Sequence, residues 1–282
     1  MKLHTNVEFL KQKALNIRMS VIRSLTAAGS GHLGGSLGLA DIFATLYFHV
    51  LNHRPLDPLW ENRDRLVLSI GHVAPALYAS LAEAGYFEKE ELLSLRKIGS
   101  RLQGHPGRDH GLPGIELSAG SLGQGLSVAV GMALADKIDK KNRKIYCILG
   151  DGEINEGSVW EAAMSASHYK LKKLTAIVDR NFCQIDGRTE KVMKLEPLAE
   201  KWKAFGWNVF ECNGNSIPDL LQTFSAFDLR VQQPSVIIAN TKMGKGIAEI
   251  EDDYRWHGKV PSDAQAKQFI NQLKASADYV HS

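Results

Sequence analysis

The sequence predicts an α/β protein in which a parallel sheet of about five or more strands carries helices on both faces. Helical patterns separate most of its short apolar runs. Continuous apolar strands that alternate with helices are typical of a parallel sheet buried on both faces. The predicted strands are RLVLS (65–69), KIYCIL (144–149), LTAIVD (174–179), WNVFE (207–211) and SVIIAN (235–240).

The predicted helices follow from apolar spacing. The first opens with a capping box, Thr5 to Glu8, and carries apolar residues at helical intervals from Val7 to Leu25. A glycine-rich loop (28–38) and a helix that is apolar nearly all round (39–51) come next. Further helices are expected over 122–138, 156–169 and 216–227, and a helical tail over 262–282.

The composition indicates one globular domain spanning residues 1–282, with no repeat or linker, and Met1 and the amphipathic tail read as natural ends. A net charge of +3, from basic residues that look scattered along the sequence, argues against a nucleic-acid partner. The three cysteines form no CxxC pair, and the N-terminus has no signal peptide, so a cytoplasmic location is expected. The uncharged stretch 117–135 is interpreted as a glycine turn and a short buried helix rather than a membrane span.

Negative charge and glycine gather where the second predicted strand ends. Asp151, Glu153 and Glu156 lie in the stretch GDGEINEG, just before a predicted helix. Gly150 and Gly152 permit a tight turn and close approach of a ligand to the backbone, and the helix start favours phosphate. A carboxylate beside phosphate needs a divalent cation between them, and Mg²⁺ is held in this way.

A second set of candidate ligands follows the next strand. Asp179 and Asn181 leave the sheet into a loop closed by Asp186 and Gly187. Because ligands of parallel sheets bind beyond the carboxyl ends of the strands, Asp151 and Asn181 can meet at one ion. The alternative is that Asp151 only caps a helix and Asn181 only forms an Asx turn. The occurrence of both motifs at consecutive strand ends favours a metal–diphosphate site.

Two literal nucleotide-binding motifs lack the required context. The GxGxxG match at 29–34 follows a helix instead of a strand, and TKMGKG (241–246) lacks features of a P-loop. Both segments are nevertheless expected to keep their backbone exposed, as phosphate sites do.

The spacing GDG, 28 residues, then Asn181 resembles the signature of thiamine-diphosphate-dependent enzymes. Further segments, in the same order, are similar to the N-terminal region of transketolase and extend from about residue 18 to 262. They are SGHLGGSLG, GHVAPALYA, LQGHP, ELSAGSLGQGLSVAVGMA, GDGEINEGSVWEAA, IVDRNFCQIDG, TKMGKG and WHGKVPS. The resemblance implies the thiamine-diphosphate-binding fold, in its diphosphate-binding (PP-type) form. It also implies transfer of a two-carbon ketol unit from a ketose phosphate to an aldose phosphate, as in the pentose phosphate pathway.

The resemblance also implies roles for individual residues. Asp151, Asn181 and the backbone carbonyl of Cys183 correspond to ligands of Mg²⁺, for which Ca²⁺ or Mn²⁺ can substitute. Gly152 corresponds to a diphosphate contact, and Glu156 to a carboxylate that links cofactor sites between subunits. Many relatives have Asn-Asn where this chain has Arg180-Asn181, and the ligand position is kept. Other positions matched to cofactor contacts are Gly120, Leu122 and Gly150.

Four histidines beside glycine, in separate loops, correspond to residues around the cofactor and the sugar. His105 is expected to bond the terminal hydroxyl of the donor, and His32 and His257 to assist proton transfers. His257 is also expected to contact the cofactor, and His72 to lie nearer the diphosphate. Imidazole suits these roles because it exchanges protons near neutral pH. A lone loop histidine is, by itself, more often structural or solvated.

The resemblance implies a second polypeptide. Family members use a glutamate from a pyrimidine-binding domain, and only about 40 residues follow the last strand here, where another α/β domain needs roughly 100. The chain therefore resembles the N-terminal subunit of a split transketolase, which pairs with a separate C-terminal subunit in an α₂β₂ assembly. Small residues at 162, 163, 165 and 166 would suit close helix packing at an interface or in any tight core.

Three alternatives remain at this point. One is the α subunit of a 2-oxo acid dehydrogenase E1, although the histidine-bearing loops favour a reaction on sugar hydroxyls. Another is a related transferase that uses an unusual or sulfonated sugar. The third is a catalytically silent regulatory or scaffold paralogue, which would be expected to have lost metal ligands or histidines that this chain keeps.

Overall fold

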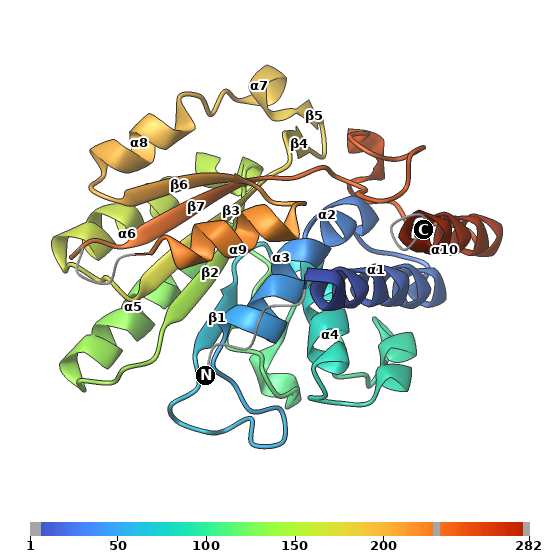
Figure 1. Ribbon diagram of the computed structural model, residues 1–282, viewed down its shortest axis with the longest axis horizontal. Helices are drawn as coiled ribbons and strands as arrows, with labels where there is room; N and C mark the ends of the chain where they lie inside the picture. Colours follow the sequence, from blue (N-terminus) through green and yellow to red (C-terminus); the bar gives the residue numbers. More distant parts are fainter. Residues whose placement is uncertain (1–6, 228–231, 279–282) are drawn as a thin grey trace.

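The computed structural model describes residues 7–227 and 232–278, and at its centre lies a five-stranded sheet (Figure 1). Every neighbouring pair of strands is parallel, and the order is β1-β2-β3-β7-β6. All five predicted strands are confirmed. Their bounds are β1 Arg65–Leu68, β2 Ile145–Gly150, β3 Leu174–Arg180, β6 Asn208–Asn213 and β7 Ser235–Asn240.

The register aligns the carboxyl ends of the central strands. Gly150 pairs with Asp179, and Asp179 pairs in turn with Ala239. All seven residues of β3 are buried because β3 has a strand on each side and helices on both faces. The residues that follow β2 and β3 therefore emerge side by side at one edge of the sheet.

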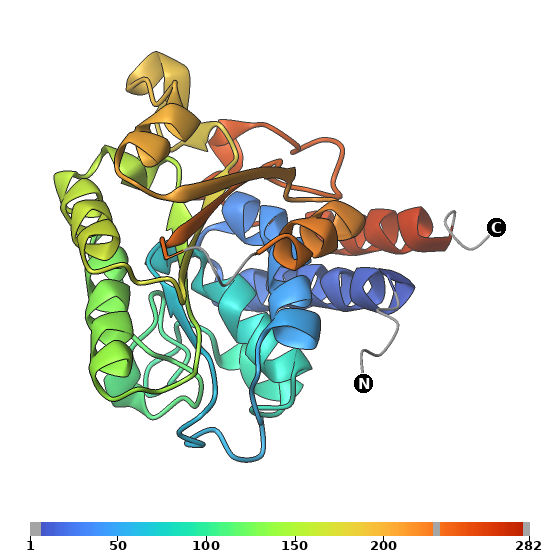
Figure 2. The same ribbon diagram turned by 60° about the vertical axis from the view of Figure 1, so that its left-hand side comes forward.

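One face of the sheet is covered by α5 Gly125–Ile138, α6 Gly157–His168 and α8 Leu198–Ala204 (Figure 2). Their apolar side chains form one core cluster with side chains from the strands. Ala162, Ala163 and Ala166 are buried inside this cluster. These three small residues therefore serve packing within the chain, and they do not supply an exposed interface.

The other face carries α1 Val7–Ala28, α3 Ala40–Thr45, α4 Ala74–Glu83 and α9 Ile217–Ser225, with α10 Asp263–Asp278 lying against α1 (Figure 1). The helix predicted over 39–51 is confirmed as α3 and a π-helical turn, Leu46–Val50. The predicted capping box lies partly outside the described residues, because Thr5 does. The helical tail is confirmed up to residue 278.

The glycine-rich stretch 28–38 is not the exposed loop that was expected, because α2 Leu33–Gly38 is a buried helix within it. A Cβ on Gly34 would lie 2.5 Å from Cγ of Met243, and one on Gly38 would lie 2.8 Å from the carbonyl oxygen of Lys242. The glycines thus let the 241–246 segment pack directly on this helix. Neither segment is an open phosphate loop, so that expectation was wrong.

Short elements complete the described chain. The hairpin β4 Cys183–Gln184 and β5 Gly187–Arg188 precedes α7 Thr189–Val192. Within the described ranges, no helix has the length and apolar character needed to cross a membrane. The 3₁₀ turns are Gly71–Val73, Lys89–Ser94, Arg108–His110, Gly152–Asn155 and Tyr254–Trp256.

Basic residues that look scattered in the sequence gather at the amino ends of β2 and β3. They surround a cavity of about 250 Å³ between the ends of α5 and α6. Two connections that are separate in the sequence meet here because both lead from a helix into neighbouring strands. The description of the basic residues as scattered is therefore wrong for this edge. The basic residues of the cavity are Lys137, Lys140, Lys141, Arg143, Lys170, Lys172 and Lys173.

Candidate active site

A second cavity, of about 400 Å³, lies beyond the carboxyl ends of β1, β2 and β3. Every residue assigned to the site from the sequence lines it except Glu156, which is exposed and outside the lining. The role of Glu156 at a contact between subunits stays a prediction. The assigned residues in the lining are His32, His72, His105, Gly120, Leu122, Gly150, Asp151, Gly152, Asn181, Cys183 and His257.

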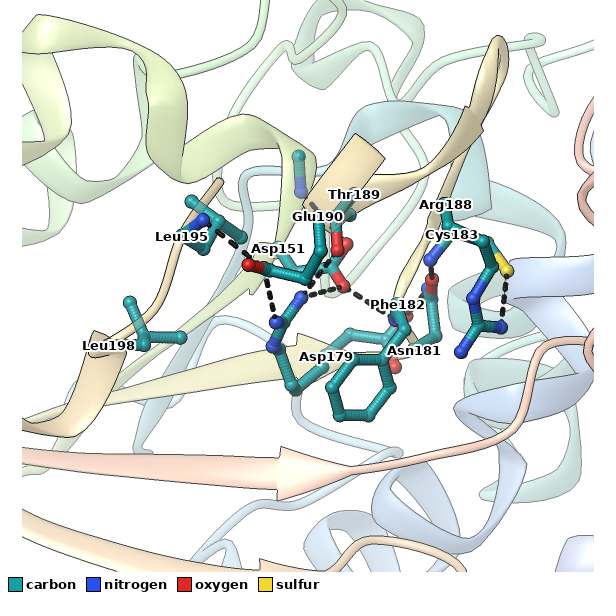
Figure 3. A network of polar contacts seen from close by, with 12 residues as sticks. Asp151, Asp179, Asn181, Phe182, Cys183, Arg188, Thr189, Glu190, Leu195 and Leu198 are labelled. Carbon is teal, nitrogen blue, oxygen red and sulfur yellow. Dashed lines mark hydrogen bonds and ion pairs between the residues drawn. The ribbon is translucent and has the colours of Figure 1, made fainter. Parts of the chain in front are cut away.

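Asp151 and Asn181 both line this cavity, and Figure 3 shows them in one network of polar contacts. Oδ1 of Asp151 accepts a hydrogen bond from the backbone N–H of Gly152 at 2.8 Å. Oδ2 accepts one from the backbone N–H of Phe182 at 2.7 Å and one from Nη1 of Arg180 at 3.1 Å. The Asp151 carboxylate is therefore held by both the turn of its own strand and the loop of the next one.

The two structural alternatives from the sequence also hold. Asp151 is the N-cap of the 3₁₀ turn Gly152–Asn155, and Asn181 forms an Asx turn in which Oδ1 accepts from the N–H of Cys183 at 2.9 Å. These bonds do not compete with a ligand role. A carboxylate or amide oxygen has two lone pairs, and each of these Oδ1 atoms accepts one hydrogen bond here.

The backbone of the second loop is unusual at Phe182, which adopts a positive φ of 61°. A bulky residue in this left-handed region costs about 1–2 kcal/mol, and such residues concentrate at functional sites. The conformation points the N–H of Phe182 at Asp151. Next to it, the Cys183 thiol is buried, and burial raises its pKa, so the thiol stays neutral.

The chemistry of these donors fits Mg²⁺ better than a transition metal. No group of three His, Cys, Asp or Glu side chains within 7–227 and 232–278 is arranged to hold an ion. One carboxylate, one amide and a backbone carbonyl form an oxygen set, to which a diphosphate would add its own oxygens. The residues present therefore fit a Mg²⁺–diphosphate group.

Burial shifts the pKa values of two carboxyl groups in the cavity lining, those of Asp151 and Asp179. It raises the pKa of Asp151 to about 6, against the opposing attraction of Arg180. It also raises the pKa of Asp179 to about 7, although Thr241 and Asn181 donate hydrogen bonds to that carboxylate. A divalent cation would favour the ionised form of both groups, which is the usual effect of an opposite charge nearby.

Three histidines from distant parts of the chain form a cluster in the lining of the same cavity. The ring centroids of His32 and His72 are 4.9 Å apart, and those of His72 and His257 are 5.0 Å apart. The ring of His32 stands edge-on to that of His257 at 5.7 Å. His105 lines the same cavity and is more exposed.

The clustered histidines are neutral at physiological pH. Burial lowers the pKa of His32 to about 4 and that of His72 to about 3, and it also lowers the pKa of His257 and His105. Nδ1 of His32 and Nδ1 of His257 are buried without a hydrogen-bond partner. Buried polar atoms are normally satisfied, so both rings of these cavity-lining residues have hydrogen-bonding capacity that the protein does not use.

Glu153 is a site residue whose role the sequence did not reveal. Its buried carboxylate accepts hydrogen bonds from the backbone N–H groups of Gly123 and Gly150, at 2.8 and 2.9 Å, and from the hydroxyl of Ser69. It thereby ties the ends of β1 and β2 to the loop before α5. The only signal in the sequence was a third carboxylate close to the GDG turn.

Arg180 is the other functional residue that sequence reasoning missed. In the sequence it stands out only as a departure from Asn-Asn, yet it is the one cation that bonds Asp151 among the described residues. Nothing in the sequence marks its partners, because its bonds depend on the path of the loop that follows.

Residues 10–278 match the family described as transketolase, thiamine diphosphate binding domain. The chain is 41% identical to one of the subunits of the apulose-4-phosphate transketolase of Phocaeicola vulgatus, over 95% of this chain and 94% of that protein. It is also 41% identical to the 6-deoxy-6-sulfo-D-fructose transketolase subunit SqwG of a Clostridium species, over 94% and 96% of the two chains. These subunits are therefore similar to this chain along almost their whole length.

Longer relatives match over a part of their length. Human transketolase is 42% identical over 95% of this chain and 42% of its own. The solved transketolase of Campylobacter jejuni superposes with a TM-score of 0.89 at 34% identity, covering 97% of this chain and 43% of that one. The chain thus spans less than half the length of these transketolases.

The fold, the cavity lining and the sequence similarity all indicate a protein of transketolase type. The matches support an enzyme of transketolase type with this chain as one subunit, and they do not favour the α subunit of a 2-oxo acid dehydrogenase. The chain belongs to the transketolase family, in which it corresponds to the thiamine-diphosphate-binding domain.

Proposed function

We propose that this chain is the cofactor-binding subunit of a two-chain transketolase that acts in the cytoplasm. It would transfer a two-carbon ketol unit from a ketose phosphate to an aldose phosphate. The observation that carries the proposal is a single cavity lined both by oxygen donors and by a cluster of neutral imidazoles. Such a cavity suits a cofactor that is anchored by its diphosphate and reacts at its opposite end.

At the anchored end, Asp151, Asn181 and the carbonyl of Cys183 would hold Mg²⁺, and Ca²⁺ or Mn²⁺ could replace it. Gly152 and Gly150 would let the diphosphate approach the backbone, and Leu122 and Gly120 would lie along the cofactor. The proposal is supported by the position of all these residues on the cavity wall. Thiamine diphosphate, when bound, supplies the nucleophilic carbon that the reaction requires.

At the reactive end, neutral imidazoles can accept or donate a proton without a prior change of charge. His32 and His257 would move protons at the sugar hydroxyls and carbonyl, and the position of both rings in the cavity lining supports this. His105 would bond the terminal hydroxyl of the donor, and His72 would lie nearer the cofactor. General acid–base groups of this kind typically contribute a factor of about 10² to 10⁴ in rate.

The remaining half of the site would come from a separate C-terminal subunit, and the assembly would be α₂β₂. Two relatives similar over nearly their whole length are named as single subunits of an apulose-4-phosphate transketolase, which supports a partner chain. Glu156, exposed beside the cavity, would then contact the neighbouring chain at the interface.

The relatives differ in the sugar for which they are named. The relatives include subunits named for apulose 4-phosphate and for 6-deoxy-6-sulfo-D-fructose, at the same 41% identity. A ketose phosphate remains the proposed donor, and the histidines of this chain would meet its ketol end.

The test is native mass spectrometry of the tagged chain, purified from its own source with Mg²⁺ present, followed by assays on the complex. We expect a second chain of similar size, bound thiamine diphosphate, and transfer from xylulose 5-phosphate to ribose 5-phosphate. Transfer only from apulose 4-phosphate or 6-deoxy-6-sulfofructose would replace the substrate and keep the reaction. A homo-oligomer that binds no thiamine diphosphate would contradict the proposed function.

A further inference from the structure

Arg180 is a buried cation that joins three carboxylates from three segments. Its side chain is 1% exposed. Nη1 donates to Oδ2 of Asp151 at 3.1 Å and to Oγ1 of Thr189 at 2.7 Å. Nη2 donates to Glu190 at 2.8 Å and to Glu196 at 2.9 Å. Figure 3 labels three of these acceptors, Asp151, Thr189 and Glu190.

The arrangement fixes how Asp151 can act. Its Oδ2 is occupied by Arg180 and by the N–H of Phe182, so a free lone pair remains on Oδ1. The guanidinium is itself immobile, since its carbon lies 4.1 Å from the centre of the Phe182 ring and its planar fork serves several acceptors. Arg180 therefore holds the carboxylate in one orientation.

A guanidinium next to a cation site carries an electrostatic cost, because it repels the ion that its partner should bind. Glu190 and Glu196 offset that charge on the side of Arg180 away from Asp151. One arginine and these two glutamates together carry one negative charge. Glu190 and Glu196 are 36% and 54% exposed and do not line the cavity.

We infer that Arg180 is a positioning residue for the metal ligand Asp151, and that Glu190 and Glu196 are the counter-charges that make this role compatible with cation binding. The inference rests on the proposed function in that it takes Asp151 as a ligand. It assigns a function in metal binding to two partly exposed glutamates that lie outside the cavity lining. A purely structural network would only fasten residues 189–196 to the end of β3.

The test is Mn²⁺ binding by the full chain with thiamine diphosphate, in complex with its partner subunit, followed by the electron paramagnetic resonance signal of free Mn²⁺. The double variant Glu190→Gln/Glu196→Gln keeps size and polarity and removes two negative charges. We expect its Kd for Mn²⁺ to rise about fivefold, the effect of two partly exposed charge interactions. Glu200→Gln is the matched control, since Glu200 is an exposed glutamate of α8 that pairs with Lys203, and its Kd should stay unchanged.

The variant Arg180→Met distinguishes the effect of Arg180 on the orientation of the Asp151 carboxylate from the effect of its positive charge on the bound cation. Removal of a cation would by itself tighten Mn²⁺ binding, whereas loss of an oriented Asp151 weakens it. We expect weaker binding, by about tenfold, the lower end of what the loss of a metal ligand's supporting partner costs. Tighter binding, or a lower melting temperature with an unchanged Kd in the double variant, would overturn the inference. If the unsubstituted complex bound no Mn²⁺, the proposed function itself would fail, and the inference with it.

Discussion

The backbone N–H of Asp151 donates a hydrogen bond to the carbonyl oxygen of Asp179 at 3.2 Å. This bond extends the β2–β3 ladder one residue beyond Gly150, where β2 ends. It places two buried carboxylates at the edge of one cavity. The parallel pairing of two strands thus brings together groups that are distant in the sequence, and the metal site proposed here depends on that pairing.

Replacement of Asp151 by asparagine should abolish metal-dependent cofactor binding. Asparagine keeps the shape and one oxygen but loses the charge that a divalent cation needs, so the Kd of thiamine diphosphate with Mg²⁺ should rise roughly 100-fold or more. Calorimetric titration measures this change, and the far-ultraviolet circular dichroism should be retained. Asp109→Asn, at an exposed aspartate outside the cavity, is the control. An unchanged Kd in Asp151→Asn would remove Asp151 from the ligand set.

Replacement of His105 by alanine should raise the KM for the donor sugar in the reconstituted complex. One hydrogen bond to the substrate is worth about 1–1.5 kcal/mol, so the expected rise is about tenfold, with little change in the KM for the acceptor. Steady-state assays that vary each sugar in turn separate the two constants. His110 is exposed and outside the cavity, so His110→Ala should alter neither. Equal donor KM values for the two variants would exclude His105 from the donor site.

The buried histidines should make a destabilising contribution to the cofactor-free chain in mild acid. In the folded state the pKa of His72 is about 3 and that of His32 about 4, whereas unfolded histidine has a pKa of about 6.5. At these two histidines the unfolded chain therefore binds more protons below that value, so their contribution to the free energy of unfolding falls as the pH drops from about 6.5 toward 4. The raised pKa values of Asp151 and Asp179 act in the opposite direction over this window, so the histidine contribution has to be isolated by substitution. Urea unfolding at several pH values measures the slope.

His72→Gln isolates the contribution of one ring to that pH dependence, because glutamine does not titrate. We expect the slope of unfolding free energy against pH, between about 4.5 and about 6.5, to be smaller in His72→Gln than in the unsubstituted chain. Identical slopes would mean that His72 is protonated in the folded state, contrary to its burial.

Two glycines of α5 should respond in opposite directions to alanine. A Cβ on Gly125 would lie 2.7 Å from Cα of Ser69, whereas one on Gly131 would have nothing within 4 Å. Gly125→Ala should therefore lower the free energy of unfolding by about 1–3 kcal/mol. Gly131→Ala should raise it by up to about 1 kcal/mol, because alanine is the better helix former. Urea denaturation compares them, and equal effects would contradict the close approach of α5 to β1.

Much of the site could be predicted because strand ends follow from hydrophobicity. The run 174–179 is apolar for most of its length, and the polar residues after such runs in a parallel sheet meet at one edge. Asp151 and Asn181 follow from this rule, and the resemblance to transketolase supplied the histidines. These predictions depend on local pattern and topology, which a single sequence carries.

Other features depended on contacts between distant residues. In the sequence, Gly34 and Gly38 suggest only a flexible backbone. In the structure they leave room for Met243 and Lys242, and this close packing involves a segment far along the chain. Arg180 directly precedes Asn181, yet its bonds to Glu190 and Glu196 depend on the course of the following loop. The sequence contains these residues without indicating which of them meet.

The histidine cluster and the ligand end of the cavity differ in how the chain must assemble them. Asp151 and Asn181 directly follow two consecutive strands, β2 and β3, whereas His32 and His257 come from distant parts of the sequence. Closing a long loop has a higher entropy cost than closing a short one, and contacts distant in sequence slow folding. The ion-binding edge is therefore expected to form early during folding, and the imidazole end only when the first and last thirds of the chain have docked.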